Sequence, residues 1–150
     1  MPLPKRRFVI EDELTTDAPA DAVMGKILDP KTWPVWQSEI RAVSGPERIA
    51  EGDEINGDAG LVGFEVEGVS HAREVSGNRF VEDVVVGVRM EVFYDVSNKG
   101  GRTVVTRRLE ANLPGGVIGT ALSVLLRFKL RKMQRDVLRD LAAYASEGSG

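Results

Sequence analysis

The sequence contains no cysteine and only one histidine, His71. Without cysteine there is no disulfide and no thiolate nucleophile or metal ligand, so the fold depends on its core for stability. A Cys–His dyad is excluded, and His71 would be the only imidazole base available to a Ser–His–Asp triad. The sequence also lacks the G-x-S-x-G motif of serine hydrolases. His71 shares its strand phase with Glu65, Glu67 and Arg73, so we expect it to face water rather than to serve as a base.

Long hydrophobic runs and an excess of positive charge are also absent. No window approaches about 18 uninterrupted apolar residues, which is the minimum for a membrane-spanning helix. The net charge of −3 disfavours a nucleic-acid partner, because such proteins need a basic face. The first residues do not have the pattern of a signal peptide. We therefore expect a cytoplasmic protein with one domain over residues 1–150 and flexible ends at 1–5 and 146–150.

Glycine and acidic residues are concentrated in "EGDEINGDAG", which invites a calcium loop. The spacing fails, since taking Asp53 as the first ligand places Ile55 where the second should be. The glycines of "GDAGLVG" do not have the spacing of a dinucleotide-binding motif. We predict no metal and no cofactor, and we assign both stretches to strand edges and turns.

The hydrophobic periodicity changes along the chain and predicts an α+β domain. Residues 6–14 alternate as a half-buried strand, and a helix starting at Thr16 or Asp17 should end at Pro30. Residues 40–113 contain about six short segments separated by turn signals, typical of an antiparallel meander. The strongest hairpin signal is "SNKGGR". In the strand before it, one face should carry the apolar residues, which are Val88, Met90, Val92, Tyr94 and Val96.

The last segment predicts a helix over residues 116–145, about 45 Å long at 1.5 Å per residue. Its apolar residues recur every three or four positions and form one continuous stripe, so the helix must pack on the sheet. That stripe consists of Leu122, Leu126, Leu130, Met133, Val137, Leu141 and Tyr144.

Both tryptophans, Trp33 and Trp36, lie in "DPKTWPVWQSEI", three residues apart. If this stretch forms a helical turn with Pro34 at its start, both indoles can point inward. They can cap the core or form the lid of an apolar pocket, and core at the rim of a cavity is also pocket wall.

Three stretches together resemble the START-like, polyketide cyclase/dehydrase and lipid-transport superfamily. They are "DAPADAVMGKILDPKTWPVW", "RIAEGDEI" and "NLPGGVIGTALSVLLRFKLRKMQRDVLRDLAAY". The resemblance implies a helix-grip fold, in which a curved antiparallel sheet of about seven strands wraps around a long C-terminal helix. It also implies two short helices after the first strand.

The superfamily includes lipid and sterol carriers, polyketide cyclases, quinone-binding proteins and chaperone activators. Our leading hypothesis is a carrier or sensor of a hydrophobic or aromatic small molecule, such as a lipid, polyketide or quinone. The inward strand phases and the helix stripe supply the predicted ligand-binding residues. These are Trp33, Trp36, Phe64, Val66, Ser70, Met90, Val92, Tyr94, Arg107, Leu109, Leu126 and Met133.

Two charged residues, Arg107 and Asp12, interrupt inward-facing apolar phases. A buried arginine requires a carboxylate, carbonyl groups, water or an anionic ligand. Arg107 therefore pairs with an acid, turns outward at a bulge, or serves with Tyr94 as a polar anchor for a ligand.

Two alternative functions remain. The first is a polyketide cyclase or dehydratase, for which Arg107, Tyr94 and Ser70 are the candidate set. The second is a protein-interaction module that uses an exposed Phe93 and a row of arginines on the last helix. That row is either a solvated face or a weak contact for an anionic membrane or a protein, in a monomer or a homodimer. It consists of Arg127, Arg131, Arg135 and Arg139.

Overall fold

The computed structural model describes residues 6–61, 64–86, 88–113 and 116–147. These residues form seven strands and four helical segments. The strands are β1 (Arg6–Thr16), β2 (Ile40–Ser44), β3 (Glu54–Leu61), β4 (Phe64–Val75), β5 (Arg79–Val86), β6 (Val88–Lys99) and β7 (Arg102–Leu113). The helical segments are α1 (Ala20–Ile27), the 3₁₀ turn η1 (Pro30–Thr32), the single turn α2 (Trp33–Trp36) and the long α3 (Gly116–Glu147).

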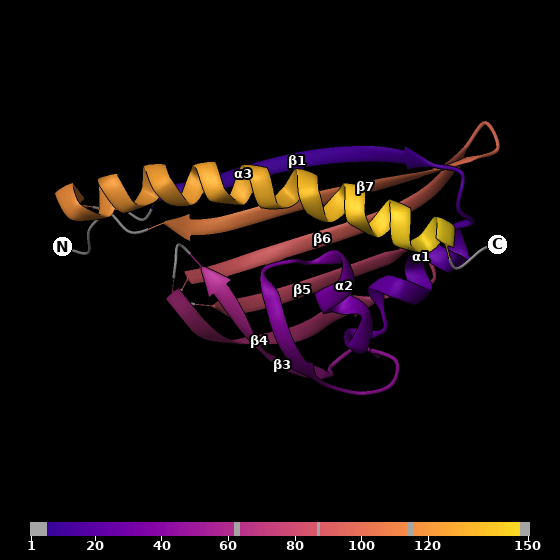
Figure 1. Cartoon of the computed structure of the whole chain (residues 1–150), viewed down its shortest axis with the longest axis horizontal. Coiled ribbons are helices and arrows are strands. Elements are labelled where there is room, and N and C mark those ends of the chain that lie inside the picture. Colours follow the sequence, from indigo (N-terminus) through magenta and orange to yellow (C-terminus); the bar gives the residue numbers. More distant parts are fainter. Residues whose placement is uncertain (1–5, 62–63, 87, 114–115, 148–150) are drawn as a thin grey trace.

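The strands form one antiparallel sheet in the order β1-β7-β6-β5-β4-β3-β2. Chain order is kept from β2 to β7, so this part is a meander, and β1 joins at the β7 edge. The helix α3 lies along the sheet, with α1 and α2 beside its C-terminal part (Figure 1). This is the α+β helix-grip architecture that the sequence predicts, and the prediction is confirmed.

Alternation of apolar residues decides which face of the sheet α3 covers. Val92, Tyr94 and Val96 on β6 are buried, as their strand phase predicts. The β6–β7 hairpin turns at Gly100 and Gly101, whose φ angles of 61° and 82° strongly favour glycine. The predicted hairpin is therefore confirmed.

The predicted start of the first helix is wrong by three or four residues. The helix α1 begins at Ala20, and Pro19 occupies the N-cap position without a side-chain cap. The Thr16 hydroxyl instead accepts a hydrogen bond from the Ala18 N–H, which belongs to the turn after β1. Residues 1–5 and 148–150, predicted to be flexible, lie outside the described residues, and Ser146 lies in the last turn of α3.

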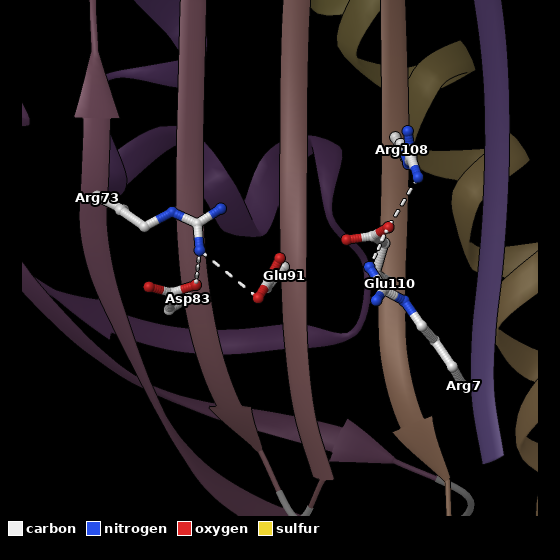
Figure 2. A network of polar contacts seen from close by, with 6 residues as sticks. All are labelled: Arg7, Arg73, Asp83, Glu91, Arg108 and Glu110. Atoms are coloured by element: carbon white, nitrogen blue, oxygen red, sulfur yellow. Dashed lines mark hydrogen bonds and ion pairs between the residues drawn. The ribbon is translucent and has the colours of Figure 1, made fainter. Parts of the chain in front are cut away.

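The face of the sheet opposite α3 carries paired charges. Arg73 of β4 bonds to Asp83 on the neighbouring strand β5 and lies 3.5 Å from Glu91 on β6, the next strand of the sheet (Figure 2). Glu110 lies between Arg7 and Arg108, at 2.6 and 2.7 Å. This face is solvated and charged, so the functional site must be sought on the other face.

Candidate functional site

The short helical segment η1–α2 places both tryptophans against the sheet. Pro34 lies in the first turn of α2, where its missing N–H is not needed, and both indoles are buried. Trp33 Nε1 donates to the Ile27 carbonyl at 2.8 Å, and Trp36 Nε1 donates to Thr32 Oγ1 at 3.1 Å. The indole donors are thus satisfied locally, which fixes the rings at one end of the sheet.

These indoles belong to an aromatic cluster. Trp36 meets Tyr94 edge-on at 6.2 Å between ring centroids, and Phe80 stacks on Tyr94 at 5.8 Å. Trp33 contacts both Trp36 and Phe80. Such pairs add about 0.5–1.5 kcal/mol each beyond the area they bury. The cluster therefore holds both indoles in fixed positions in the core.

A cavity of about 100 Å³ lies beside this cluster, between the sheet and α3. Its wall is mostly apolar, and polar groups are few. The residues that bear on its chemistry are Trp33, Gln37, Glu39, Asp58, Ser70, Glu82, Met90, Val92, Arg107, Leu130 and Met133.

Arg107 is buried in the cavity wall, with 3% of its surface exposed. Its Nε donates to the Tyr94 hydroxyl at 3.0 Å, and one Nη donates to Gln134 Oε1 at 2.5 Å. Gln134 Nε2 in turn donates to the Arg107 carbonyl at 2.6 Å. The helix α3 therefore binds both the guanidinium and the backbone of β7 through one amide side chain.

Glu82, on β5, is the second buried charged residue of the cavity wall. Burial raises the pKa of Glu82 to about 7, and the positive charge of Arg107 opposes this shift. Its Oε2 is buried without a hydrogen-bond partner in the described part of the structure, as is Ser70 Oγ. Burial also raises the pKa of Tyr94 to about 12, so its hydroxyl stays protonated at neutral pH.

Residues 7–146 match the family described as polyketide cyclase/dehydrase and lipid transport. This chain belongs to that family. No curated protein sequence matches it significantly.

Solved structures show how widely the cyclase and lipid-transport fold is shared. The chain is similar to the Zhui aromatase/cyclase from Streptomyces sp. R1128, with 12% identity, 94% of each chain covered and a TM-score of 0.82. It is also similar to TTHA0849 from Thermus thermophilus, with 17% identity, 95% of this chain and 99% of that chain covered and a TM-score of 0.81. A START superfamily protein from Mycobacterium smegmatis shares 12% identity over 93% of this chain and 97% of its own, with a TM-score of 0.75. At these identities the likeness concerns the fold alone.

In this member of the cyclase and lipid-transport family, the predicted site residues fall into three groups. Those in the cavity wall are Trp33, Ser70, Met90, Val92, Arg107 and Met133. Those packed in the core behind or beside the wall are Trp36, Val66, Tyr94 and Leu109. The side chains of the third group, Phe64 and Leu126, lie outside the described residues.

Sequence analysis missed Glu82 and Gln134. Glu82 shares its strand phase with Phe80 and Val84, and Gln134 stands within the apolar stripe of α3. A polar residue within an apolar strand or helix phase is the signal that could have identified both, as it identified Arg107 and Asp12. Asp12 is half-buried and lies opposite Arg107 in the β1–β7 register.

The residues predicted to form a contact surface differ in how exposed they are in the structure. Phe93 was expected to be exposed but is half-buried, with the guanidinium groups of Arg73 and Arg79 5.6 and 5.7 Å from its ring centre. Arg127 and Arg131 lie 5.5 and 5.4 Å from the ring centre of Phe8 on β1. These two arginines therefore pack against the sheet.

The other two arginines of the row, Arg135 and Arg139, are exposed, and Arg139 pairs with Asp136 and Asp140. None of the helices in the described part of the chain has the length and hydropathy of a membrane-spanning segment. The same residues include no group of three or more acidic or histidine side chains that could hold a metal ion.

Proposed function

We propose that this protein binds a hydrophobic or aromatic small molecule in the cavity between the sheet and α3. The observation that carries the proposal is the cavity itself, an apolar wall with a few buried polar side chains. Such walls are typical of small-molecule sites, in which apolar area gives affinity and a few polar groups give orientation. Met90 and Met133 add flexible side chains that adapt to the shape of a ligand.

The volume of the cavity restricts the size of the ligand that it can hold. At about 100 Å³ the cavity is small, whereas drug-sized ligands occupy pockets of roughly 300–1,000 Å³. A molecule of one or two rings suits this space better than a long acyl chain. Binding, not chemistry, is the proposed role.

Native mass spectrometry of the purified protein, followed by denaturation and identification of what is released, tests this function. We expect an apolar small molecule of low mass. An empty protein whose tryptophan fluorescence does not respond to a panel of hydrophobic ligands would contradict the proposal, because Trp33 forms part of the cavity wall.

A cyclase or dehydratase is the second candidate, and Glu82 favours it. Its pKa of about 7 suits a group that gives or takes a proton near neutral pH, and it faces the cavity with Arg107. Incubation with a poly-β-ketone thioester, followed by measurement of aromatic product, tests this activity. Product formation that Glu82→Gln abolishes would establish it, and a bound thioester that is released unchanged would refute it.

A protein or membrane contact through the arginine row has less support, because Arg127 and Arg131 pack on Phe8. Flotation with vesicles of anionic lipid at low salt tests it. Loss of flotation on charge reversal at Arg135 and Arg139 would support it, and absence of flotation in the unaltered protein would exclude the membrane.

A further inference from the structure

Two oxygen atoms in the cavity wall lack hydrogen-bond partners among the described residues. They are Ser70 Oγ and Glu82 Oε2, and the two residues are only 5% and 6% exposed. More than about 90% of buried polar groups in folded proteins are paired, so each unpaired group requires an explanation. A ligand in the cavity would explain both groups, because it would form the missing hydrogen bonds.

Both residues face the same region of the cavity. Glu82 pairs with Ala72 in the β4–β5 register, and Ser70 stands two residues away on β4. Diagonal neighbours of this kind are about 7–8 Å apart, within reach of each other's longer side chains. A single group on a ligand can therefore approach both oxygens.

The charge of the wall restricts what that group can be. Arg107 is the one basic side chain in this wall among the described residues, and it is already bound by Tyr94 and Gln134. Glu82 lies close enough to Arg107 for their charges to interact, and Glu39 and Asp58 add further negative charge to the wall. An anionic ligand would thus meet more negative than positive charge.

Resting on the proposed function, we propose that the cavity selects a neutral apolar molecule bearing a hydroxyl group, which donates a hydrogen bond to Glu82 and accepts one from Ser70. A hydroxyl is both donor and acceptor, so it matches a carboxylate and a serine together. A hydrocarbon leaves both oxygens unpaired. A carboxylate offers Glu82 no donor and adds a second negative charge beside it.

Three probes of nearly equal shape separate these cases: naphthalene, 2-naphthol and 2-naphthoate. Binding is followed by NMR through the indole N–H signals, since the protein has two tryptophans and only Trp33 lines the cavity. Titrations are run at pH 8, where Glu82 is mostly ionised because its pKa is about 7. We expect 2-naphthol to bind about tenfold or more tightly than naphthalene, as hydrogen bonds to ionised groups allow, and 2-naphthoate to bind most weakly.

Matched variants assign the preference to these two residues. Glu82→Gln replaces the ionised acceptor by a weaker neutral one, so 2-naphthol should lose about threefold or more in affinity while naphthalene keeps its affinity. The same variant should bind 2-naphthoate more tightly than the unaltered protein does, because one negative charge is removed from the wall. Ser70→Ala should also weaken 2-naphthol selectively. The control is Glu91→Gln, the same exchange on the opposite face of the neighbouring strand, and it should change none of the three affinities.

The outcomes distinguish this inference from the proposed function. If naphthalene and 2-naphthol bind equally well, the hydroxyl preference is wrong, and if 2-naphthol keeps its advantage in both variants, recognition of the hydroxyl by Glu82 and Ser70 is wrong. In either case the cavity remains a binding site. If 2-naphthoate binds most tightly, Arg107 recognises an anion and the inference is wrong. If no probe moves the Trp33 signal, the proposed function fails and the inference fails with it.

Discussion

Arg107 shows how a guanidinium is accommodated inside an apolar wall. Sequence reasoning required an acidic partner, an outward turn or a ligand, but the structure satisfies the side chain with two neutral groups, Tyr94 and Gln134. The Gln134 amide also bonds back to the Arg107 carbonyl. Removal of one member of such a buried network leaves the others unpaired.

Gln134→Ala should therefore lower the free energy of unfolding by about 2–4 kcal/mol, since it removes one hydrogen bond from the buried guanidinium and another from the Arg107 carbonyl and leaves only Tyr94 bound to the side chain. Arg135→Ala is the control, because Arg135 is the next residue of α3 and is exposed. That exchange should change stability by no more than about 0.5 kcal/mol. Urea unfolding measures both, and equal effects would show that Gln134 contributes only helix propensity.

Glu82 makes stability depend on pH in a direction that its burial sets. Its pKa rises from 4.5 to about 7 on folding, with Asp83 adding to the shift while the charge of Arg107 opposes it. The contribution of Glu82 to the free energy of unfolding is thus fully present below about pH 4.5 and is lost as the pH rises through 7. The loss at pH 8 amounts to about 3 kcal/mol.

Glu82→Gln should accordingly stabilise the protein at pH 8 by up to about 3 kcal/mol and change it by less than about 1 kcal/mol at pH 5. Urea unfolding at the two pH values checks this, with Glu91→Gln, a half-buried position on the face opposite α3, as the comparison. A gain of equal size at both pH values would show that the effect is not the titration of Glu82.

At the scale of the elements, the backbones of β2 and β3 approach each other too closely to leave room for a side chain between them. A Cβ on Gly57 would lie 2.7 Å from the Ala42 carbonyl oxygen on β2. No strand residue with a side chain fits there without movement of the backbone. Gly25, inside α1, has nothing within 4 Å of such a Cβ.

Substitution of these two glycines by alanine should have opposite effects. Gly57→Ala should destabilise the protein by about 1–3 kcal/mol through overpacking. Gly25→Ala should stabilise it by about 0.5–1 kcal/mol, since alanine favours the helix and does not clash. Thermal unfolding of the two variants measures the difference, and a stabilised Gly57→Ala would show that β2 moves away from β3 without loss.

At the scale of the whole molecule, the two faces of the sheet respond to pH in opposite ways. On the outer face, burial raises the pKa of Glu110, but the hydrogen bonds and charges of Arg7 and Arg108 outweigh it and hold the pKa below 4.5. Its contribution to stability is present above that value and is lost as pH falls. Glu82, on the face covered by α3, makes the protein less stable as pH rises, so stability should be greatest between the two pH ranges.

A molecule bound between the sheet and α3 should stabilise the whole fold, because its site exists only in the folded chain. At a free concentration 100 times its dissociation constant, a ligand adds about 2.7 kcal/mol. For a chain of this size that corresponds to a rise in Tm of about 5–10 °C. Differential scanning fluorimetry with 2-naphthol measures the shift. In Ser70→Leu, whose larger side chain fills part of the cavity, 2-naphthol should raise Tm only slightly. A rise equal to that of the unaltered protein would show that the ligand binds elsewhere.

The sequence predicted those features that follow from local periodicity and turn chemistry. The alternation in β6, the glycines of the β6–β7 hairpin and the stripe of α3 each identified an element and the face that it buries. The predicted start of α1 at Thr16 or Asp17 was wrong because β1 continues to Thr16 and Pro19 occupies the N-cap position.

What the tertiary structure alone decided is which polar residues meet. Arg107 was recognisable as a misplaced charge, yet nothing local shows that its partner lies 27 residues away on α3. The pairing depends on how the helix packs on the sheet. Likewise, the strand phase of Glu82 is visible in the sequence, but its unpaired oxygen and raised pKa come from the neighbours that surround it. The sequence by itself determined the elements and their buried faces, because those depend on residues close along the chain. The chemistry of the cavity depends on residues brought together from β4, β5, β6, β7 and α3, and only their packing in three dimensions decides it.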